Sequence, residues 1–431
     1  MTDILDELQW RGLVAQTTDE PALRRALAEG PLTVYCGFDP TAPSLHFGNL
    51  VQLVVLRRLQ RAGHRVICLV GGSTGLIGDP RPTAERMLKT KEQTAEWVAR
   101  IEEQVRPFLA TEGENPAVVV NNLEWTEGLS ALDFLRDVGK HFRVNQMLRK
   151  DAVAARLASD EGISYTEFSY QLLQGLDYLE LYRQYGCTLQ TGGSDQWGNL
   201  VAGADLIHRV EGASVHLLTT PLLTDSGGEK FGKSAGNAIW LSADMTSPYA
   251  FYQYWLNVED ASVARLLKVF TDLDPQEVAE LERALAEEPW KRAAHRVLAS
   301  EVTTLVHGAE ATAAVRAASE ALFGRGDPRA LDARTLRDAA AELPSGPVTV
   351  GMALVDVLVA VGLADSRNAA RRTLGEGGAS VNGQKVADPE ATLGPRDVLP
   401  GGVVLLRRGR KSLAAGLVAD APAEPDDVSR G

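Results

Sequence analysis

Short runs of β-branched and apolar residues recur through the first half of this 431-residue chain, and helix-like segments separate most of them. Strands that alternate with helices indicate a parallel sheet with helices on both faces. We therefore expect an α/β domain with a Rossmann-like parallel sheet over about residues 30–235. The expected strands are residues 33–36, 65–70, 117–120, 188–190 and 215–218.

Loops rich in glycine follow several of these strands, at residues 37–41, 71–75, 192–195 and 225–234. Ligands of open α/β sheets bind outside the carboxyl ends of the strands. The four loops should therefore converge on one crevice.

Composition excludes several classes of protein. The first sixteen residues include three acidic side chains and no basic start before an apolar stretch, so a secretory signal is not expected. No apolar run approaches the roughly eighteen residues of a membrane span. The three cysteines are widely spaced, which fits neither a disulfide framework nor a structural zinc site. We expect a cytoplasmic protein with no bound structural metal.

Beyond the α/β region the pattern changes twice. Residues 247–323 are rich in Ala, Glu, Leu and Arg with no strand candidates, and glycine and proline interrupt both ends of residues 324–347. We expect five segments: a nucleotide-binding catalytic domain with an N-terminal helix over 1–235, an α-helical domain over 236–325, a linker over 326–348, a small α+β domain over 349–412 and a disordered acidic tail over 413–431.

The small C-terminal domain shows two local signals. Leu354, Val357, Leu358 and Val361 form the apolar stripe of an amphipathic helix. A second helix capped by Ser366 precedes two short strands joined by an Asn-Gly pair, which favours a tight hairpin.

Positive charge gathers in the same domain. The chain has a net charge of −13, yet residues 362–411 contain nine basic and five acidic residues, so this segment is at +4 and the remainder at −17. This asymmetry makes the segment the expected contact for a polyanion such as RNA, although solvated helix faces also carry such charges. The expected RNA-binding residues are Arg367, Arg371, Arg372, Lys385, Arg407, Arg408, Arg410 and Lys411.

A lysine-rich loop follows the last expected strand of the α/β domain. In Lys230-Phe231-Gly232-Lys233-Ser234 two ammonium groups and a hydroxyl surround a glycine that lets the backbone approach an anion. Such a loop can hold phosphates, but lysine and glycine also occur together at solvated hairpin tips.

A second motif opens a helix after the first expected strand. In His46-Phe47-Gly48-Asn49 an imidazole and an amide can both donate hydrogen bonds to phosphoryl oxygens at a helix N-terminus, which already favours anions. Gly48 leaves room for a purine ring. The same two side chains can instead simply cap the helix.

The two motifs together resemble the signatures of class I aminoacyl-tRNA synthetases. Three further segments narrow the resemblance to the bacterial-type tyrosyl-tRNA synthetases, and it covers nearly the whole chain. Residues 349–411 resemble the S-four-type RNA-binding domain that this family has at its C-terminus. The three segments are Tyr35-Cys36-Gly37-Phe38-Asp39-Pro40-Thr41, Tyr165-Thr166-Glu167-Phe168-Ser169-Tyr170 and Gly192-Gly193-Ser194-Asp195-Gln196-Trp197-Gly198-Asn199.

The resemblance implies a binding site for tyrosine. Tyr35 and Asp177 would bind the phenolic hydroxyl of the substrate, which phenylalanine lacks. The substrate's ammonium group would be held by Asp79, Tyr170 and Gln174, and its carboxylate by Gln196. Tyr170, Gln174 and Asp177 are four and three residues apart, which places them on one helix face.

The resemblance also implies ATP as the second substrate, with Mg²⁺ bound to it and no dedicated protein cage for the ion. Tyrosine would attack the α-phosphorus to give tyrosyl-adenylate and pyrophosphate, and tyrosine would then pass to the 3′ end of the tRNA. Catalysis would depend on positioning and charge stabilisation. The ATP-binding residues would be Gly37, Asp39, His46, Gly48, Asn49, Gly193, Asp195 and Lys233. The residues acting on the phosphates would be Thr41, His46, Asn49, Arg86, Lys230, Lys233 and Ser234.

The sequence departs from the family pattern in two places. Asn49 stands where the class motif has a histidine, although an amide also donates. The loop between Asp79 and Arg86 is a residue shorter than expected and lacks a lysine, for which Arg81 is the candidate replacement.

Three other functions are compatible with parts of the sequence. A tryptophan-specific relative would share the fold, but Tyr35 and Asp177 suit a phenol better than an indole. An RNA-binding protein without catalysis would not need His46, Lys230 and Lys233. A generic nucleotidyltransferase would leave the basic C-terminal domain unexplained. Family resemblance also implies a homodimer.

Overall fold

The computed structural model describes residues 3–81, 87–224, 231–234, 237–323, 326–409 and 412–418, with the backbone alone at 233, 234 and 237. Two compact units make up the chain, one formed by residues 1–245 and 258–294 and the other by residues 246–257 and 295–431. No helix among the described residues is long and apolar enough to cross a membrane.

The first unit is built on a six-stranded sheet in the order β1-β6-β5-β2-β3-β4. Neighbouring strands from β6 to β4 run parallel, and the short β1 pairs antiparallel with β6 at the edge. This confirms the parallel sheet expected from the sequence. The strands are β1 (Gln16–Thr17), β2 (Thr33–Phe38), β3 (Arg65–Val70), β4 (Val118–Asn121), β5 (Cys187–Gly193) and β6 (His216–Thr220).

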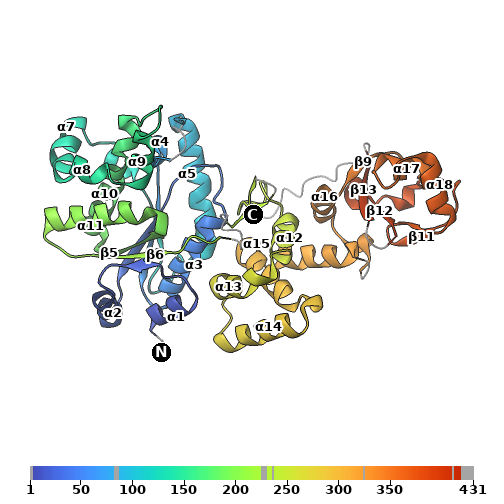
Figure 1. The fold of residues 1–431 in the computed structure, drawn as a ribbon, viewed down its shortest axis with the longest axis horizontal. Coiled ribbons are helices and arrows are strands. Elements are labelled where there is room, and N and C mark those ends of the chain that lie inside the picture. The colour runs from blue at the N-terminus through green and yellow to red at the C-terminus, as the bar shows by residue number, and fades with distance from the viewer. Residues whose placement is uncertain are drawn as a thin grey trace. The chain divides into compact units, whose positions relative to one another are not determined.

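Helices cover both faces of this sheet. α3 and α5 lie on one face and α10 and α11 on the other (Figure 1). The helices of the α/β region are α1 (Ile4–Trp10), α2 (Glu20–Glu29), α3 (Phe47–Arg61), α4 (Thr74–Ile77), α5 (Lys91–Val105), α6 (Leu123–Thr126), α7 (Ala131–Asp133), α8 (Val144–Met147), α9 (Asp151–Leu157), α10 (Tyr165–Tyr185) and α11 (Trp197–Glu211).

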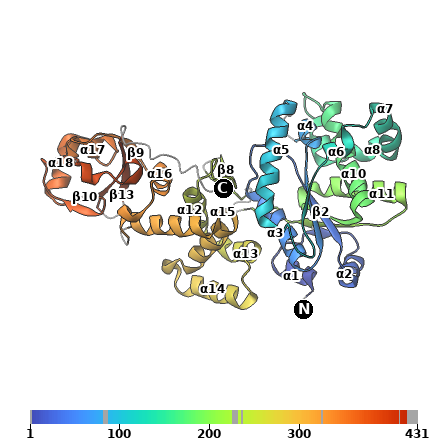
Figure 2. The same cartoon turned by 180° about the vertical axis from the view of Figure 1, so that it is seen from behind.

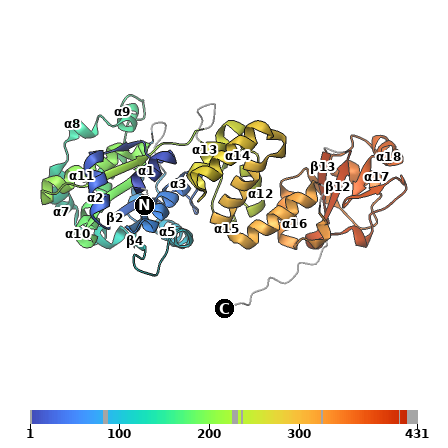
Figure 3. The same ribbon diagram turned by 90° about the horizontal axis from the view of Figure 1, so that it is seen from below.

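Residues 258–294 belong to the first unit, which differs from the single helical domain expected over residues 236–325. They form α13 (Asp260–Phe270) and α14 (Pro275–Glu287), which lie side by side (Figure 3). A two-stranded ribbon of β7 (Lys233–Ser234) and β8 (Asn237–Ala238) precedes them.

The second unit joins helices to a five-stranded sheet in the order β11-β10-β12-β13-β9. α17 and α18 pack together beside this sheet (Figure 2). Its elements are α12 (Pro248–Leu256), α15 (Ala293–Leu322), α16 (Ala333–Ala341), β9 (Ser345–Val348), α17 (Leu354–Ala360), α18 (Arg367–Gly375), β10 (Ala379–Val381), β11 (Gln384–Val386), β12 (Val403–Arg408) and β13 (Ser412–Val418).

Local predictions in this unit are confirmed. The four apolar residues of the predicted stripe on α17 are at most 3% exposed and belong to the core of the unit. The Ser366 hydroxyl accepts from the Ala369 amide and so caps α18. Asn382 and Gly383 both have positive φ, as a tight hairpin between β10 and β11 requires.

The expected linker and tail need correction. Residues 326–348 contain α16, whose apolar face is buried, and β9, which pairs in parallel with β13. Residues 413–418 lie in β13 and are not part of a tail. Pro347 is tolerated in β9 because the strand lies at the sheet edge. Gly346 is needed there since a Cβ would meet the Ala360 carbonyl oxygen at 2.2 Å.

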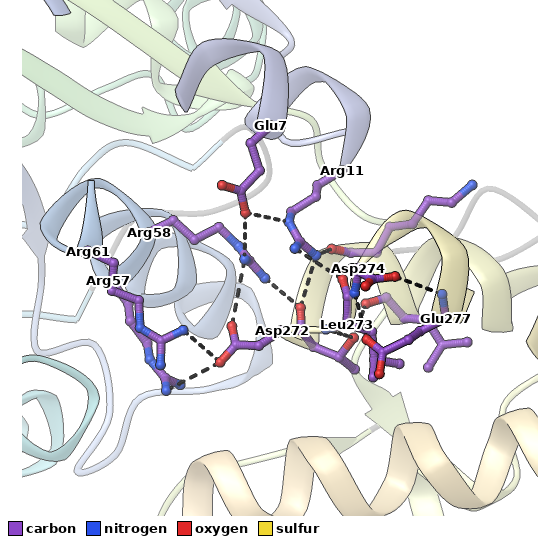
Figure 4. A network of polar contacts seen from close by, with 12 residues as sticks. Glu7, Arg11, Arg57, Arg58, Arg61, Asp272, Leu273, Asp274 and Glu277 are labelled. Carbon is purple, nitrogen blue, oxygen red and sulfur yellow. Dashed lines mark hydrogen bonds and ion pairs between the residues drawn. The ribbon is translucent and has the colours of Figure 1, made fainter. Parts of the chain in front are cut away.

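A network of arginines joins α1, α3 and the end of α13 in the first unit (Figure 4). The Arg11 guanidinium donates to the carbonyl oxygens of Lys268 and Thr271 at 2.9 and 3.0 Å. The Arg58 guanidinium donates to the same Thr271 oxygen at 2.6 Å, and both arginines contact Glu7. They thereby supply donors to carbonyl groups that a helix leaves unpaired at its C-terminus.

Two carboxylates balance the positive charge of this network, Glu7 in α1 and Asp272 just after α13. Arg11 and Arg58 are 5% and 6% exposed. Burial and the nearby Arg11 lower the pKa of Arg58 to about 10, which leaves it charged at neutral pH. Asp272 contacts Arg58 at 3.7 Å and Arg61 at 2.7 Å. The carboxylates therefore compensate buried positive charge at the end of α3.

We expect Arg11→Met to lower the free energy of unfolding by about 3 kcal/mol, because it removes the guanidinium donors of the Lys268 and Leu273 carbonyl oxygens and a positive partner of Glu7. Arg61→Met is the matched control. The Arg61 side chain is half exposed and Asp272 retains other arginine partners, so its loss should cost less than about 1 kcal/mol. Urea unfolding of both variants measures the difference, and equal losses would contradict a structural role for the buried charge.

Candidate active site

Loops at the carboxyl ends of the strands meet, as the sequence predicts. Asp39, just after β2, accepts hydrogen bonds from the Thr74 and Tyr170 hydroxyls, both at 2.7 Å. Thr74 begins α4, within the glycine-rich segment that follows β3. A Cβ at Gly71 would lie 2.1 Å from the Asp39 carboxylate, so the glycine is required for this approach. The geometry joins β2, β3 and α10 in one site.

Buried polar side chains connect to these loops, because Asn122 Nδ2 donates both to the Thr74 hydroxyl and to the Asp177 carboxylate. The Tyr35 hydroxyl is buried and has no hydrogen-bond partner among the described residues. Asp177, on α10, is 1% exposed, and its carboxylate accepts from Asn122 Nδ2 at 3.0 Å and Trp125 Nε1 at 2.9 Å. Burial raises the pKa of Asp177 from its ordinary 3.8 to about 7.

Tyr35 and Asp177 are both buried and close enough to interact electrostatically. Burial is the main cause that raises the pKa of Tyr35, and the Asp177 charge raises it further. A phenol placed here could accept from Tyr35 and donate to Asp177. Sequence reasoning found these two residues but missed Asn122 and Trp125, which come directly after β4 and belong to no motif.

A second group of polar side chains surrounds Asp79. Gln196 Nε2 donates to Asp79 Oδ2 at 3.2 Å, and Asn199 Nδ2 donates to Gln196 Oε1 at 2.8 Å. Lys150, which the sequence analysis did not single out, reaches Asp79 Oδ1 at 2.7 Å. Gln174 Oε1 is buried without a partner among the described residues. The group therefore contains acceptors suited to an ammonium ion.

The motif at residues 46–49 forms the N-terminus of α3. His46 Nδ1 accepts from the Gly48 amide at 3.0 Å, and Asn49 Oδ1 accepts from the His46 amide at 3.0 Å. Both side chains thus cap the helix. Because His46 Nδ1 is an acceptor, the neutral imidazole has its proton on Nε2. Capping uses only His46 Nδ1 and Asn49 Oδ1 as acceptors, so it does not conflict with donation by the other ends of these side chains, and the two interpretations of this motif are compatible.

The two signature segments lie against each other. The Phe47 and Phe231 ring centroids are 5.1 Å apart, and the Phe47 amide donates to the Ile239 carbonyl at 3.0 Å. Gly232 has φ 93°, and a Cβ on it would lie 2.7 Å from the Phe47 ring. Glycine is therefore required where the lysine-rich loop packs on α3.

Several predicted phosphate-binding residues cannot be placed. Lys230 and Arg86 lie outside the described residues, and Lys233 and Ser234 are described only as the backbone of β7. Thr41 is exposed next to Asp39. Arg81 is exposed too, and its replacement of the missing lysine stays a prediction.

Two of the predicted ATP-binding residues, Gly193 and Asp195, lie at the end of β5. Gly193 ends the strand, and a Cβ there would be 2.6 Å from Asp195 Oδ1. Gly37 lies within β2, where an added Cβ would make only an ordinary contact with Leu69. Steric need therefore explains Gly193 better than Gly37.

The predicted RNA-binding residues fall into three groups. Arg408 is exposed but donates to the Leu363 carbonyl at 2.6 Å, and Arg407 donates to the Leu322 carbonyl. Arg410 and Lys411 lie outside the described residues. The others are exposed on α18 and β11, and they are Arg367, Arg371, Arg372 and Lys385.

Two family models match the chain. The model for class I tRNA synthetases (W and Y) covers residues 27–324, and the model for the tyrosine–tRNA ligase SYY-like C-terminal domain covers residues 335–414. A tyrosine–tRNA ligase of Streptomyces coelicolor is 61% identical over 416 residues, 96% of this chain and 99% of that protein. This chain belongs to the tyrosyl-tRNA synthetase family.

Other members of the family agree. A tyrosine–tRNA ligase of Leifsonia xyli is 61% identical over 97% of this chain and 95% of its own length. A C-terminally truncated mitochondrial tyrosyl-tRNA synthetase of Aspergillus nidulans has a TM-score of 0.68 at 30% identity, covering 75% of this chain and 95% of its own. A tryptophanyl-tRNA synthetase of Encephalitozoon cuniculi, 14% identical over 72% of this chain and 87% of its own at a TM-score of 0.53, shares the fold alone.

The raised pKa of Asp177 predicts how stability depends on pH. The native state disfavours the ionised Asp177 carboxyl. Ionisation therefore does not lower the free energy of unfolding below about pH 4, and lowers it by the full amount above about pH 7. A shift of this size corresponds to roughly 4 kcal/mol. We expect wild-type stability to fall relative to Asp177→Asn as pH rises through this window. Urea unfolding without ligand measures the difference in stability between wild type and Asp177→Asn. A difference that does not vary with pH would contradict the raised pKa of Asp177.

Proposed function

We propose that this chain activates L-tyrosine with ATP and transfers it to tRNA(Tyr), as a tyrosine–tRNA ligase. The observation that carries the proposal is the buried pair of Tyr35, whose hydroxyl has no partner among the described residues, and Asp177. Burying an unpaired hydroxyl costs free energy, which a ligand phenol would recover. Phenylalanine would leave the Tyr35 hydroxyl unpaired and offer no donor to Asp177, and tyrosine-specific synthetases are the standard example of this discrimination.

Rejection of phenylalanine depends on groups that do not move. Asn122 and Trp125 fix both oxygens of Asp177, so the carboxylate cannot turn to satisfy itself elsewhere. Tyr35 packs against Tyr178 with ring centroids 5.1 Å apart. A rigid pocket of this kind discriminates without a separate editing site.

The α-ammonium and α-carboxylate of tyrosine are assigned to the polar side chains around Asp79. Asp79, Tyr170 and Gln174 bind the ammonium, and Gln196 binds the carboxylate. The Tyr170 hydroxyl donates to Asp39, which leaves its lone pairs directed at other donors. The buried Gln174 Oε1 without a partner among the described residues supports the same assignment.

ATP is assigned to the N-terminus of α3 and the loops after β2 and β5. His46 Nε2–H and the Asn49 amide donate to the phosphates together with Thr41, while exposed Gly48 leaves space for the base. Gly37, Asp39, Gly193 and Asp195 hold the nucleoside. These groups need not form a covalent intermediate, because the tyrosine carboxylate itself attacks the α-phosphorus.

The lysine-rich loop completes the phosphate site. Lys230, Lys233, Ser234 and Arg86 act on the departing pyrophosphate, and the packing of Gly232 on Phe47 supports a position near α3. Mg²⁺ arrives bound to ATP and neutralises phosphate charge. Among the described residues no group of three or more His, Cys, Asp and Glu side chains forms a metal site.

Exchange of labelled pyrophosphate into ATP tests the activation step. We expect exchange with tyrosine and essentially none with phenylalanine or tryptophan. Lys233→Ala should lower the exchange rate much more than tyrosine affinity, since its contact with pyrophosphate forms mainly in the transition state. Exchange that does not depend on tyrosine would refute the proposed function.

The basic surface of the second unit is assigned to tRNA. Arg372 and Lys385 are exposed on α18 and β11. The exposed Arg367 and Arg371 instead pair with Asp356 and Glu390 at 2.9 and 2.8 Å. These pairs lie at the surface, where they are weak enough for a phosphate to replace the carboxylate. Of the remaining candidates, Arg407 and Arg408 bind backbone carbonyls.

We expect the double variant Arg372→Glu/Lys385→Glu to raise the KM for tRNA in the charging assay and to leave pyrophosphate exchange unchanged. If each residue contacts one phosphate, the salt dependence of tRNA binding should weaken by a slope of about two. Arg408→Met is the control, because that side chain is held by Leu363. Unchanged charging by the double variant would contradict an RNA-binding role for this face.

A homodimer and a cytoplasmic location complete the proposal. Large apolar side chains are exposed between residues 132 and 165, among them Leu132, Val144 and Tyr165 at 79%, 59% and 67%. Exposed apolar side chains in this segment support a protein interface there. Sedimentation of the purified protein tests this, and a monomer would contradict it. The three cysteines are free and buried, as suits a reducing compartment.

A further inference from the structure

Lys150 places an ammonium group inside the site proposed for the amino acid. The residue directly precedes α9, and its Nζ lies 2.7 Å from Asp79 Oδ1 and 2.9 Å from Asn199 Oδ1. The side chains of Lys150 and Asp79 are only 15% and 17% exposed. A lysine Nζ is an alkylammonium with three donors, so it has the same chemistry as the α-ammonium of an amino acid.

The surroundings of this contact are arranged for one positive charge. Asp79 contributes the negative charge, and Asn199 and Gln196 hold it from two sides. Two ammonium groups a few ångströms apart in a partly buried site would repel each other by several kcal/mol. A ligand ammonium and the Lys150 ammonium therefore compete for Asp79.

We propose that Lys150 occupies the ammonium subsite in the ligand-free protein and that an amino acid binds by displacing it from Asp79. This rests on the proposed assignment of Asp79 to the ammonium of tyrosine. Lys150 neutralises Asp79 while the site is empty, and it makes entry of a bare cation unfavourable. A zwitterion brings a carboxylate near the displaced lysine and so offsets the repulsion. Lys150 is thus a specificity-determining residue that selects amino acids over amines.

Two fragments of tyrosine separate the contributions of its ammonium and its carboxylate to binding. Tyramine has the phenol and the ammonium but no carboxylate, and 3-(4-hydroxyphenyl)propanoate has the phenol and the carboxylate but no ammonium. Their dissociation constants are measured calorimetrically without ATP, on the full-length protein. The variants are Lys150→Met, which keeps the length of the side chain without the charge, and Lys150→Arg, which keeps the charge. The control is Lys140→Met, which removes an exposed lysine of the same region.

We expect Lys150→Met to bind tyramine about tenfold more tightly than wild type, and 3-(4-hydroxyphenyl)propanoate no more tightly than wild type. Lys150→Arg and Lys140→Met should bind tyramine as wild type does. Tyramine binding that is weaker in Lys150→Met would mean that the lysine only supports Asp79. Unchanged tyramine binding together with loss of the propanoate would mean that it binds a carboxylate. Either result overturns the proposal.

Asp79→Asn distinguishes failure of this inference from failure of the underlying assignment. If Asp79 binds the ammonium, the variant should weaken tyramine and leave the propanoate unaffected. Tyramine binding that survives in Asp79→Asn would refute the ammonium assignment itself. If Asp79→Asn weakens tyramine but Lys150→Met does not strengthen it, the assignment stands and displacement of Lys150 is wrong.

Discussion

Burial of two guanidinium groups at the end of α3 holds the helix on which the active site is built. The buried guanidinium groups of Arg11 and Arg58 are surrounded by the carbonyl oxygens at the end of α13 and by the Glu7 carboxylate. A buried charge that loses such partners is strongly unfavourable. The network therefore stabilises the end of α13 against α3, in agreement with the place of residues 258–294 in the first unit.

The N-terminal end of α3 lies at the candidate active site. Phe47 packs between Phe231 and Phe270, with ring centroids 5.1 and 5.0 Å away. One aromatic side chain thereby joins the two signature segments to α13. The donors of His46 and Asn49 are oriented by capping the first turn of the same helix. The residues proposed to bind phosphate are thus positioned by contacts at both ends of a fifteen-residue helix.

The proposed tyrosine site differs from this arginine network, because it contains buried polar groups to which the described residues make no hydrogen bond. The Tyr35 hydroxyl and Gln174 Oε1 are buried without partners among the described residues, which is costly in a folded protein. Asp177 is fully hydrogen-bonded, yet burial still raises its pKa. Such groups are stabilised only when a complementary ligand forms hydrogen bonds with them. The same unsatisfied groups therefore lower the stability of the free protein and make it selective for the ligand.

Sequence reasoning succeeded where a property repeats or a motif is contiguous. The parallel strands, the stripe on α17, the Asn-Gly hairpin and the two signature motifs were all predicted. The linker was wrong because proline and glycine in residues 344–347 resemble a turn, whereas pairing with β13 makes them an edge strand. Asn122, Trp125 and Lys150 were missed because each is a single residue whose role depends on a partner far along the chain.

The sequence by itself determined the class of fold, the family and the chemical types of the site residues, because these follow from periodic burial and from short motifs. Only the tertiary structure decided which partners those residues have. It placed the Lys150 ammonium on Asp79, fixed Asp177 between two unpredicted donors and left the Tyr35 hydroxyl without one among the described residues. Hydrogen bonding and desolvation depend on distances between segments remote in the chain, and no local pattern encodes those distances.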